Sequence, residues 1–428
     1  MKLKISNIGK IEKAAIEIDG ITVIAGENNT GKSTIGKLLF AIFNSMNNMD
    51  EKITQERRSR INNIVNISLQ GRVLQNTTNF AERRRNINTL TRRLSDDIME
   101  YLNGEMVENM EDFVRNKINE SSIFENKEDM EEFIKECAKR VESLMNISDK
   151  KVMTEVITRW FNRVFANQMS PLRDEGIESK VEMVIKDKKV TYIFKENACV
   201  NWESEISILH QAFYIDNPFV IDRMSTYYGT DKITESYLLG FLRNEDGDIY
   251  DNIFDAVLAK DKLDEIYNIL GEVIEGDIET NQDGEYCFKS SKYSKPLNIV
   301  NLSTGMKSFA LIKRLLECGS IKEKDVIILD EREIHLHPEW QLLYAKLIVL
   351  LQKKFDLSMI ITTHSPYFID AIDVFSSKYN ISHRTRYYLA ENVGELSSMH
   401  DVTDNIDAIY KKLSDPMQML ENLRYGVE

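Results

Sequence analysis

Residues 26–33 read Gly-Glu-Asn-Asn-Thr-Gly-Lys-Ser, which sets two glycines, a lysine and a hydroxyl group at fixed spacing. The glycines let the backbone turn so that successive N–H groups point inward at phosphate oxygens. Lys32 would reach the β- and γ-phosphates of a nucleotide, and the Ser33 hydroxyl would ligate Mg²⁺. The pattern therefore predicts a P-loop that binds ATP and Mg²⁺. Its nucleotide-binding residues are Gly26, Asn28, Asn29, Thr30, Gly31, Lys32, Ser33 and Thr34.

Two adjacent carboxylates follow an apolar run at residues 326–329, Val-Ile-Ile-Leu. A buried strand over this run would deliver Asp330 to the Mg²⁺ shell, so that Ser33 and Asp330 are the predicted metal ligands. Glu331, one residue on, would polarise the attacking water as a general base. Such a strand end is also common on solvated surfaces, and the presence of the P-loop favours the catalytic interpretation.

Ser303 and Gly305 precede a run with helical spacing through Leu311, Leu315 and Leu316. A serine and a glycine at a helix N-terminus form a second anion site, suited to a γ-phosphate. The same residues also suit an ordinary helix N-cap, and both interpretations stay open on these residues alone.

A histidine ends the apolar run that follows Asp330 and Glu331, in the segment Ile-Thr-Thr-His-Ser-Pro at residues 361–366. His364 would hydrogen-bond the γ-phosphate or the attacking water. A lone histidine is usually structural, but its place at the end of the next apolar strand favours a catalytic role. Gln211 is a weaker candidate for a nucleotide-contacting loop, and polar filler beside the core is the favoured interpretation.

Short runs rich in apolar and β-branched residues predict the strands that would position these side chains. Helical spacing follows Lys32 and recurs over residues 232–274. The P-loop thus lies between a strand and a helix, as its chemistry requires. The runs at 325–329 and 357–362 fit buried parallel strands flanked by helices. The other predicted strands cover residues 2–8, 14–25, 181–196 (a pair turning near Asp187), 213–215 and 286–288.

Between about residues 50 and 180 the chain is rich in Glu, Lys, Arg and Asn, and its apolar residues recur at helical spacing. We predict a helical insertion over 51–180, between one part of an ATPase head at 1–50 and the remainder at 181–428. Heptads are not sustained, so a long coiled-coil arm is not expected. Arginine clusters in this insertion suit nucleic-acid phosphates, but nearby acids favour a solvated helix. The clustered residues are Arg57, Arg58, Arg60, Arg83, Arg84, Arg85, Arg92 and Arg93.

The net charge of −14 argues against broad non-specific coating of nucleic acid. The four cysteines are widely spaced and contain no CxxC pair, which fits a reducing compartment and gives no zinc or disulfide framework. No apolar run approaches the ~20 residues that span a bilayer. No apolar signal segment precedes the first predicted strand. We therefore expect a cytoplasmic protein without a membrane partner.

The order of these motifs resembles the ABC-class ATPases of the SMC/RecF/OLD group. The stretch Asp-Glu-Arg-Glu-Ile-His-Leu-His-Pro at 330–338 is similar to that group's DEPEIHLHP, and residues 362–366 are similar to its TTHSP switch. The resemblance implies an α/β fold, namely a P-loop ABC-type ATPase head with a mixed sheet flanked by helices and a largely helical insertion. It further implies a homodimer or higher homo-oligomer with ATP sandwiched between two heads, in which Ser303 and Gly305 act on the partner's nucleotide.

Two departures accompany the resemblance. Arg332 stands where the group usually has proline, and the signature reads Ser-Thr-Gly rather than Ser-Gly-Gly. His335 and His337, with Glu333, invite a metal interpretation. The resemblance instead makes them part of a loop that contacts the neighbouring subunit, which we favour.

Stand-alone ATPases of this kind resemble sensor components of bacterial anti-phage systems, such as Septu, PARIS and retron-associated ATPases. That resemblance implies an ATPase that controls a separate effector, either a nuclease or a toxin. The stretch after His364 is short for a further catalytic domain, so we expect no nuclease in this chain. The alternative is a RecF-like ATPase that binds DNA directly in repair or chromosome maintenance. A transporter subunit is disfavoured, because transporter heads lack a large helical insertion at this place.

Overall fold

The chain divides into two compact units, which are described separately. The sheet unit comprises Met1–Asn47 and Ile157–Glu428, and the helical unit comprises Asn48–Val156. The computed structural model describes the backbone of residues 1–69, 72, 80–104, 109–118, 124, 126–171, 176–225, 230–243 and 253–425.

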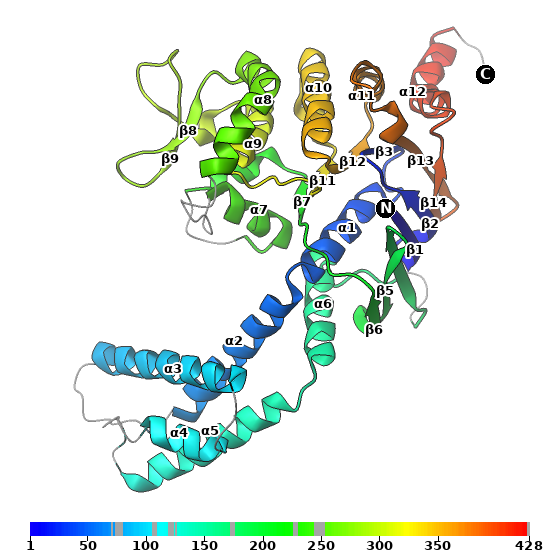
Figure 1. Ribbon diagram of the computed structural model, residues 1–428. Helices are drawn as coiled ribbons and strands as arrows, with labels where there is room; N and C mark the ends of the chain where they lie inside the picture. The colour runs from blue at the N-terminus through cyan, green and yellow to red at the C-terminus, as the bar shows by residue number, and fades with distance from the viewer. Residues whose placement is uncertain are drawn as a thin grey trace. The chain divides into compact units, whose positions relative to one another are not determined.

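The sheet unit is built on an eleven-stranded mixed sheet (Figure 1), with the order β6-β5-β4-β1-β2-β14-β13-β3-β12-β11-β7. A second sheet has the order β10-β9-β8. The strands of the large sheet are β1 Lys2–Ile8, β2 Ile11–Glu17, β3 Ile21–Gly26, β4 Ser179–Ile185, β5 Lys188–Lys195, β6 Ala198–Ser204, β7 Ala212–Ile215, β11 Val326–Asp330, β12 Ser358–Thr363, β13 Thr385–Val393 and β14 Leu396–Asp401. Those of the small sheet are β8 Asp277–Thr280, β9 Tyr286–Lys289 and β10 Leu297–Asn298.

Helices cover the parallel part of the large sheet, with α1 on one side and α10 and α11 on the other (Figure 1). In the sheet unit they are α1 Lys32–Met46, α7 Ile233–Arg243, α8 Ile253–Val273, α9 Thr304–Glu317, α10 Pro338–Phe355, α11 Pro366–Lys378 and α12 Asp407–Tyr425, with the 3₁₀ turns η1 Pro218–Arg223, η2 Ile299–Asn301, η3 Arg332–His335 and η4 Ser382–Arg384. In the helical unit they are α2 Met49–Leu69, α3 Phe80–Asn103, α4 Met110–Ile118 and α5 Lys127–Met145; α6 Asp149–Phe165 crosses between the units.

Parallel pairing of β3, β12 and β11 positions the site. Val23 pairs with Ile361, and Ile361 pairs with Leu329, so the three strands end at the same edge of the sheet. All six residues of β3 are buried, as are nearly all those of β11 and β12, which explains their continuous apolar runs. Helix α1 packs against these strands at Gly36, where a Cβ atom would lie 2.6 Å from a side-chain carbon of Ile328.

The predicted α/β fold class with a mixed sheet flanked by helices is confirmed. The predicted strand at 14–25 is two strands, because Gly20 has a positive φ of 69° and turns the chain between β2 and β3. The strand pair at 181–196 is present as β4 and β5, with Asp187 in the turn. The predicted strand ranges do not include β6, β8, β10, β13 or β14.

The helical unit differs in extent from the insertion expected at 51–180. Residues 157–180 belong to the sheet unit, because Phe161 near the end of α6 packs on Tyr192 and Phe194 of β5. Inside the helical unit, Phe133, Ile134 and Val141 of α5 are fully buried in a core shared with α2, α3 and α4. Among the described residues, no helix is both long and apolar enough to cross a bilayer.

Candidate functional site

The P-loop lies between β3 and α1 and takes a conformation that its glycines and an asparagine allow. Gly26, Asn29 and Gly31 have φ values of 147°, 62° and 80°. A Cβ atom on Gly26 would lie 2.0 Å from the carbonyl oxygen of Ala390, so no side chain fits there. Gly31 is the N-cap of α1 and supplies no side-chain cap, which leaves the first N–H groups of the helix without a side-chain partner. These groups suit an anion.

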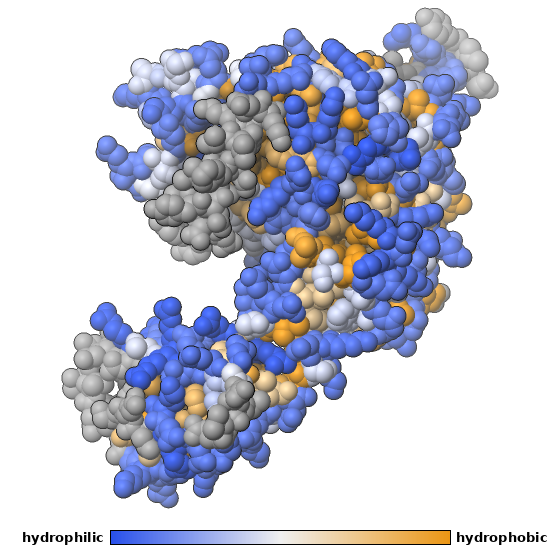
Figure 2. Space-filling model, viewed as in Figure 1, coloured by the Kyte–Doolittle hydropathy of each residue, from blue (hydrophilic) through white to orange (hydrophobic). Residues whose placement is uncertain are grey.

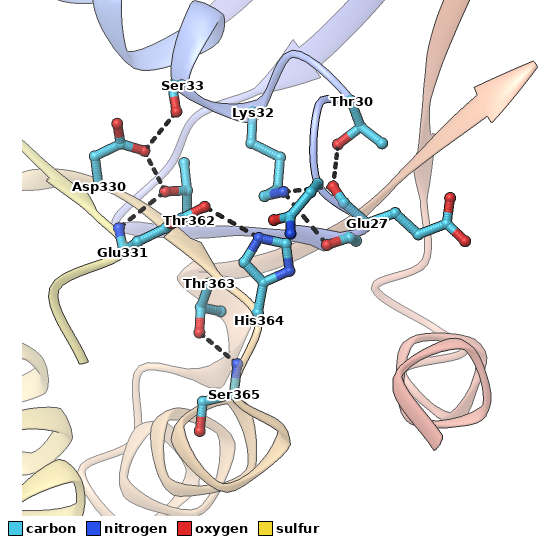
Figure 3. Close-up of polar contacts among 12 residues, drawn as sticks. Glu27, Thr30, Lys32, Ser33, Asp330, Glu331, Thr362, Thr363, His364 and Ser365 are labelled. Carbon is cyan, nitrogen blue, oxygen red and sulfur yellow. Dashed lines mark hydrogen bonds and ion pairs between the residues drawn. The ribbon is translucent and has the colours of Figure 1, made fainter. Parts of the chain in front are cut away.

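Lys32 folds back over the loop that carries it (Figure 3). Its ammonium donates to the carbonyl oxygens of Gly26 and Glu27, at 3.3 and 2.6 Å, and the residue is 4% exposed. Burial lowers the pKa of Lys32, while the carboxylates of Glu331 and Asp330 offset part of that effect. The ammonium is thus held within reach of the acids at the strand ends.

Asp330 ends β11 and accepts hydrogen bonds from three hydroxyl groups. Ser33 donates to its Oδ1 at 3.0 Å, Tyr214 donates to its Oδ2 at 2.5 Å, and Thr362 also donates to Oδ1. A carboxylate beside a serine hydroxyl is the donor set that Mg²⁺ accepts when phosphate oxygens and water complete its shell. The residues present therefore fit the ion. Among the described residues no group of three His, Cys, Asp or Glu could hold a metal, and this includes Glu333, His335 and His337.

Glu331 and His364 meet across the ends of β11 and β12. His364 Nε2 lies 3.0 Å from Glu331 Oε1 (Figure 3). Burial and the nearby Lys32 ammonium lower the pKa of His364, and Glu331 offsets part of this effect. Glu331 has a left-handed backbone with φ of 52°, and its N–H donates to the backbone oxygen and the hydroxyl of Thr362, each at 3.1 Å. A carboxylate oriented by a neutral imidazole is suited to accept a proton from water.

Three further side chains shape this centre, and the sequence did not predict the contacts through which they do so. Tyr214 and Thr362 hold Asp330, as described above. Glu333 is 1% exposed, and its Oε1 accepts from the Thr363 hydroxyl and from the backbone N–H of His364. Burial raises the pKa of Glu333. Their proximity to the centre depends on strand register, which no local pattern in the sequence encodes.

Ser303 and Gly305 lie at the start of α9 and line a different hollow. Ser303 caps the helix by accepting from the N–H of Met306 at 3.3 Å. The hollow has a volume of about 470 Å³ and is lined by Ser303, Thr304, Gly305, His335, His337 and Trp340. None of these belongs to the P-loop, and none is Asp330, Glu331 or His364. The structure therefore does not bring Ser303 and Gly305 into the P-loop site of the same chain.

Gln211 precedes β7 at the edge of the sheet opposite Asp330. Its side chain donates to the carbonyl oxygen of Ser320 at 3.3 Å and accepts from the Tyr237 hydroxyl at 3.2 Å. These contacts suit the favoured interpretation of Gln211 as a polar residue beside the core. Parallel pairing with β11 instead puts Asp216, at the end of β7, on the nucleotide side.

The arginine clusters of the helical unit are partly engaged in ion pairs. Arg57 pairs with Asp149 at 2.7 Å, and Arg58 pairs with Asp96 at 2.5 Å. Arg84 and Arg85 are exposed, whereas the side chain of Arg83 lies outside the described residues. Figure 2 shows a mainly hydrophilic visible face over this unit. These contacts suit the solvated-helix interpretation.

Comparison with known proteins places this arrangement among nucleotide hydrolases. A family model described as an AAA ATPase domain matches residues 1–369. The Septu protein PtuA of Bacillus thuringiensis is 41% identical over 83 residues, which cover 16% of this chain and 20% of that protein. The Retron Ec83 probable ATPase of Escherichia coli is 29% identical over 143 residues, which cover 27% of this chain and 25% of that protein. The matched segments are thus about a quarter or less of each relative.

Two solved structures match most of this chain at low sequence identity. The SMC head domain from Thermotoga maritima matches with a TM-score of 0.40 and 12% identity, covering 94% of this chain and 98% of that one. An SmcHead bound to the C-winged helix domain of ScpA matches with a TM-score of 0.45 and 11% identity, covering 95% and 98%.

Proposed function

Because the chain belongs to the AAA ATPase domain family, we propose that its P-loop, Asp330, Glu331 and His364 bind ATP with Mg²⁺ and hydrolyse the γ-phosphate bond. One observation carries this proposal: the Ser33 hydroxyl, the Asp330 carboxylate and the Glu331–His364 pair meet at one edge of the sheet, with contacts of 3.0 Å. That edge holds a phosphate cradle, a metal-ligand pair and a general base together.

Each residue has a distinct role in this mechanism. Backbone N–H groups of residues 26–34 hold the phosphates, and Lys32 leaves its two carbonyl partners to neutralise them. Ser33 and Asp330 would hold Mg²⁺, which when bound neutralises phosphate charge. Glu331 takes the proton of the attacking water. His364, kept neutral by burial and by Lys32, orients Glu331 and can accept or donate at its ring.

The hollow at Ser303 and Gly305 supports a site shared between two copies. The start of α9 is capped by a serine and can bind an anion, but the remaining phosphate-binding groups, those of a P-loop, must come from elsewhere. Exposed apolar side chains lie close by in the chain, since Val300 and Ile334 are each 57% exposed. We propose that ATP joins two copies, each supplying Ser303 and Gly305 to the P-loop of the other.

The biological role we favour is control of a separate effector, a nuclease or a toxin, in anti-phage defence. The support is the similarity to PtuA and to the Retron Ec83 ATPase over part of each chain. Direct DNA binding of the RecF kind is the alternative. The ion pairs of Arg57 and Arg58 weaken it, because paired guanidinium groups have less charge to offer phosphates.

A subunit-mixing experiment tests both the chemistry and the shared site. Lys32→Ala removes the ammonium that neutralises the phosphates, and Ser303→Arg blocks the start of α9. Each variant alone should hydrolyse almost no ATP. A mixture should regain activity on the order of a quarter of wild type, because half of randomly paired dimers hold one intact site. Glu331→Gln is the control: mixed with Lys32→Ala it should restore no activity, because Lys32 and Glu331 serve the same P-loop and every mixed dimer lacks an intact site. A mixture as inactive as its parts would refute the shared site, and full activity of Glu331→Gln would refute the general base.

A further inference from the structure

Arg332 is a charged side chain that the fold buries almost completely. It is 1% exposed and is among the largest fully buried side chains. Its Nη2 donates to the hydroxyl of Ser308 at 2.8 Å, while Nε and Nη1 have no partner among the described residues. Burying a guanidinium with unmet donors is costly. A packing role would be filled more cheaply by an apolar side chain, so the position calls for another explanation.

The contact that Arg332 makes joins two parts of the proposed site. Ser308 lies in α9, the helix that Ser303 caps, and its hydroxyl also donates to the carbonyl oxygen of Thr304 at 3.3 Å. Arg332 itself follows Glu331 directly in the chain. A continuous set of hydrogen bonds and one peptide bond therefore runs from the first residue of α9, through Ser308 and Arg332, to Glu331.

The backbone conformation of Glu331 depends on contacts that include those of its neighbour Arg332. Its φ of 52° is a left-handed conformation that costs a non-glycine residue energy and persists only where surrounding contacts hold it. Those contacts are the hydrogen bonds to Thr362 on one side and the anchored Arg332 on the other. The distance of 3.0 Å between Glu331 and His364 depends on this turn.

Several polar groups surround the Arg332 guanidinium besides the Ser308 hydroxyl. Burial lowers the pKa of Arg332, while the Tyr344 hydroxyl and the carboxylates of Asp216 and Glu333 act in the opposite direction. The Tyr344 hydroxyl interacts with the guanidinium, and Glu333 Oε2 has no hydrogen-bond partner among the described residues. Donors that Ser308 does not use thus remain beside the Tyr344 hydroxyl and the Glu333 carboxylate.

We propose that Arg332 is a positioning residue that couples the start of α9 to the general base Glu331. Occupation of Ser303 and Gly305 by the nucleotide of a second copy moves α9, and the Ser308–Arg332 hydrogen bond passes that movement to the Glu331 turn. ATP is then hydrolysed only after the two copies have closed on it. This inference rests on the proposed function, and it adds a residue and a route to it.

The test separates coupling from binding and from assembly. Arg332→Met removes the donors and keeps the approximate length of the side chain. Ser308→Ala removes the acceptor, together with the hydrogen bond that Ser308 donates to Thr304. Lys313→Met is the control, because Lys313 is a cation of α9 whose ion pair is with Asp277 and not with Arg332 or Glu331. For each variant we would measure ATP affinity with a fluorescent analogue, ATP-dependent dimerisation in a Glu331→Gln background, turnover, and the unfolding midpoint.

Both test variants should lose about tenfold in kcat, which corresponds to the loss of one positioning contact, with KM and dimerisation within about twofold of wild type. The double variant should be no slower than Arg332→Met, because the two residues act through one bond. Lys313→Met should retain wild-type kcat. Ser308→Ala keeps the test valid if Arg332→Met fails to fold.

Three results would overturn the coupling. Wild-type kcat in Ser308→Ala and Arg332→Met, with dimerisation intact, would show that the Ser308–Arg332 hydrogen bond does not affect turnover. Loss of dimerisation or of ATP affinity in step with kcat would show that Arg332 only supports the fold. Failure of Glu331→Gln alone to dimerise with ATP would instead refute the proposed shared site, and the coupling to a second copy would fall with it.

Discussion

Asp330 is the most constrained carboxylate of the site, since three hydroxyl groups donate to it from three elements. Ser33 and Asp330 could be paired from the sequence, because a P-loop serine and a strand-end aspartate are known by their local patterns. Tyr214 and Thr362 could not be predicted, because only the register of β7 and β12 beside β11 brings them there. The same holds for Glu333, whose carboxylate reaches residue 363 across the sheet edge.

Tyr214→Phe should loosen Asp330 without removing it. We expect the Mg²⁺ concentration for half-maximal turnover to rise by at least about tenfold, because a lost hydrogen bond to a charged group is worth about 1.5–3 kcal/mol. Titrating turnover with Mg²⁺ at saturating ATP measures the change. Tyr192→Phe is the control, since Tyr192 is fully buried on β5, away from the site. An unchanged Mg²⁺ titration for Tyr214→Phe would show that its hydroxyl does not orient Asp330.

His364 should contribute a pH dependence to stability. Its pKa in the folded protein lies below the ordinary value of 6.5, so the unfolded chain binds more protons in that range. The stabilising contribution of the neutral imidazole is therefore present above pH 6.5 and is lost as pH falls toward the folded pKa. His364→Gln should show a shallower loss of unfolding free energy between pH 6.5 and 5 than wild type in chemical denaturation without nucleotide. Parallel curves would contradict the assignment.

At the scale of elements, the strands that end at the site could be predicted from the sequence, because both faces of a buried parallel strand are apolar. The runs that became β3, β11 and β12 are such strands. Strand β10 escaped prediction because it is only two residues long. Residues 157–165 escaped assignment to the sheet unit because helical periodicity is the same on both sides of the boundary.

Gly36→Ala should force α1 away from β11. The added methyl group would lie 2.6 Å from Ile328 and 3.1 Å from Tyr214, so we expect a loss of about 1–3 kcal/mol in unfolding free energy and weaker ATP binding. Gly240→Ala is the matched control in helix α7, where a Cβ atom meets nothing within 4 Å. Helix propensity alone should make that variant slightly more stable. Equal stability of the two variants would show that α1 is not in close contact with the sheet.

At the scale of the whole molecule, each unit has a core of its own. The helical unit buries Phe133 and Ile134, whereas in the sheet unit Phe40 of α1 packs with Trp160 of α6 at a centroid distance of 6.1 Å. The two ends of the sheet unit that flank the helical unit are therefore close together. That proximity could not be foreseen from the sequence, which marks an insertion by composition but not where its ends meet.

Replacing residues 48–156 by a short glycine-serine linker should leave a folded sheet unit that binds ATP. We expect nucleotide affinity within about threefold of wild type, because no residue of the proposed site lies in the removed segment, and a single cooperative unfolding transition. Fluorescent-nucleotide titration and thermal unfolding measure both. A chain that is insoluble or fails to bind nucleotide would show that the helical unit is needed for the fold of the sheet unit.

The place of the β13–β14 hairpin has a consequence for the order of events during synthesis. This hairpin lies between β2 and β3 in the sheet, and its Ala390 carbonyl oxygen sits where a side chain on Gly26 would be. Lys412 of α12 then pairs with Glu27 of the loop at 2.9 Å. On the ribosome, the P-loop is among the first segments to emerge, yet its walls arrive only after residue 390. A nascent chain stalled before that point should not bind ATP. Nucleotide therefore stabilises the completed sheet and does not assist the early steps of its folding.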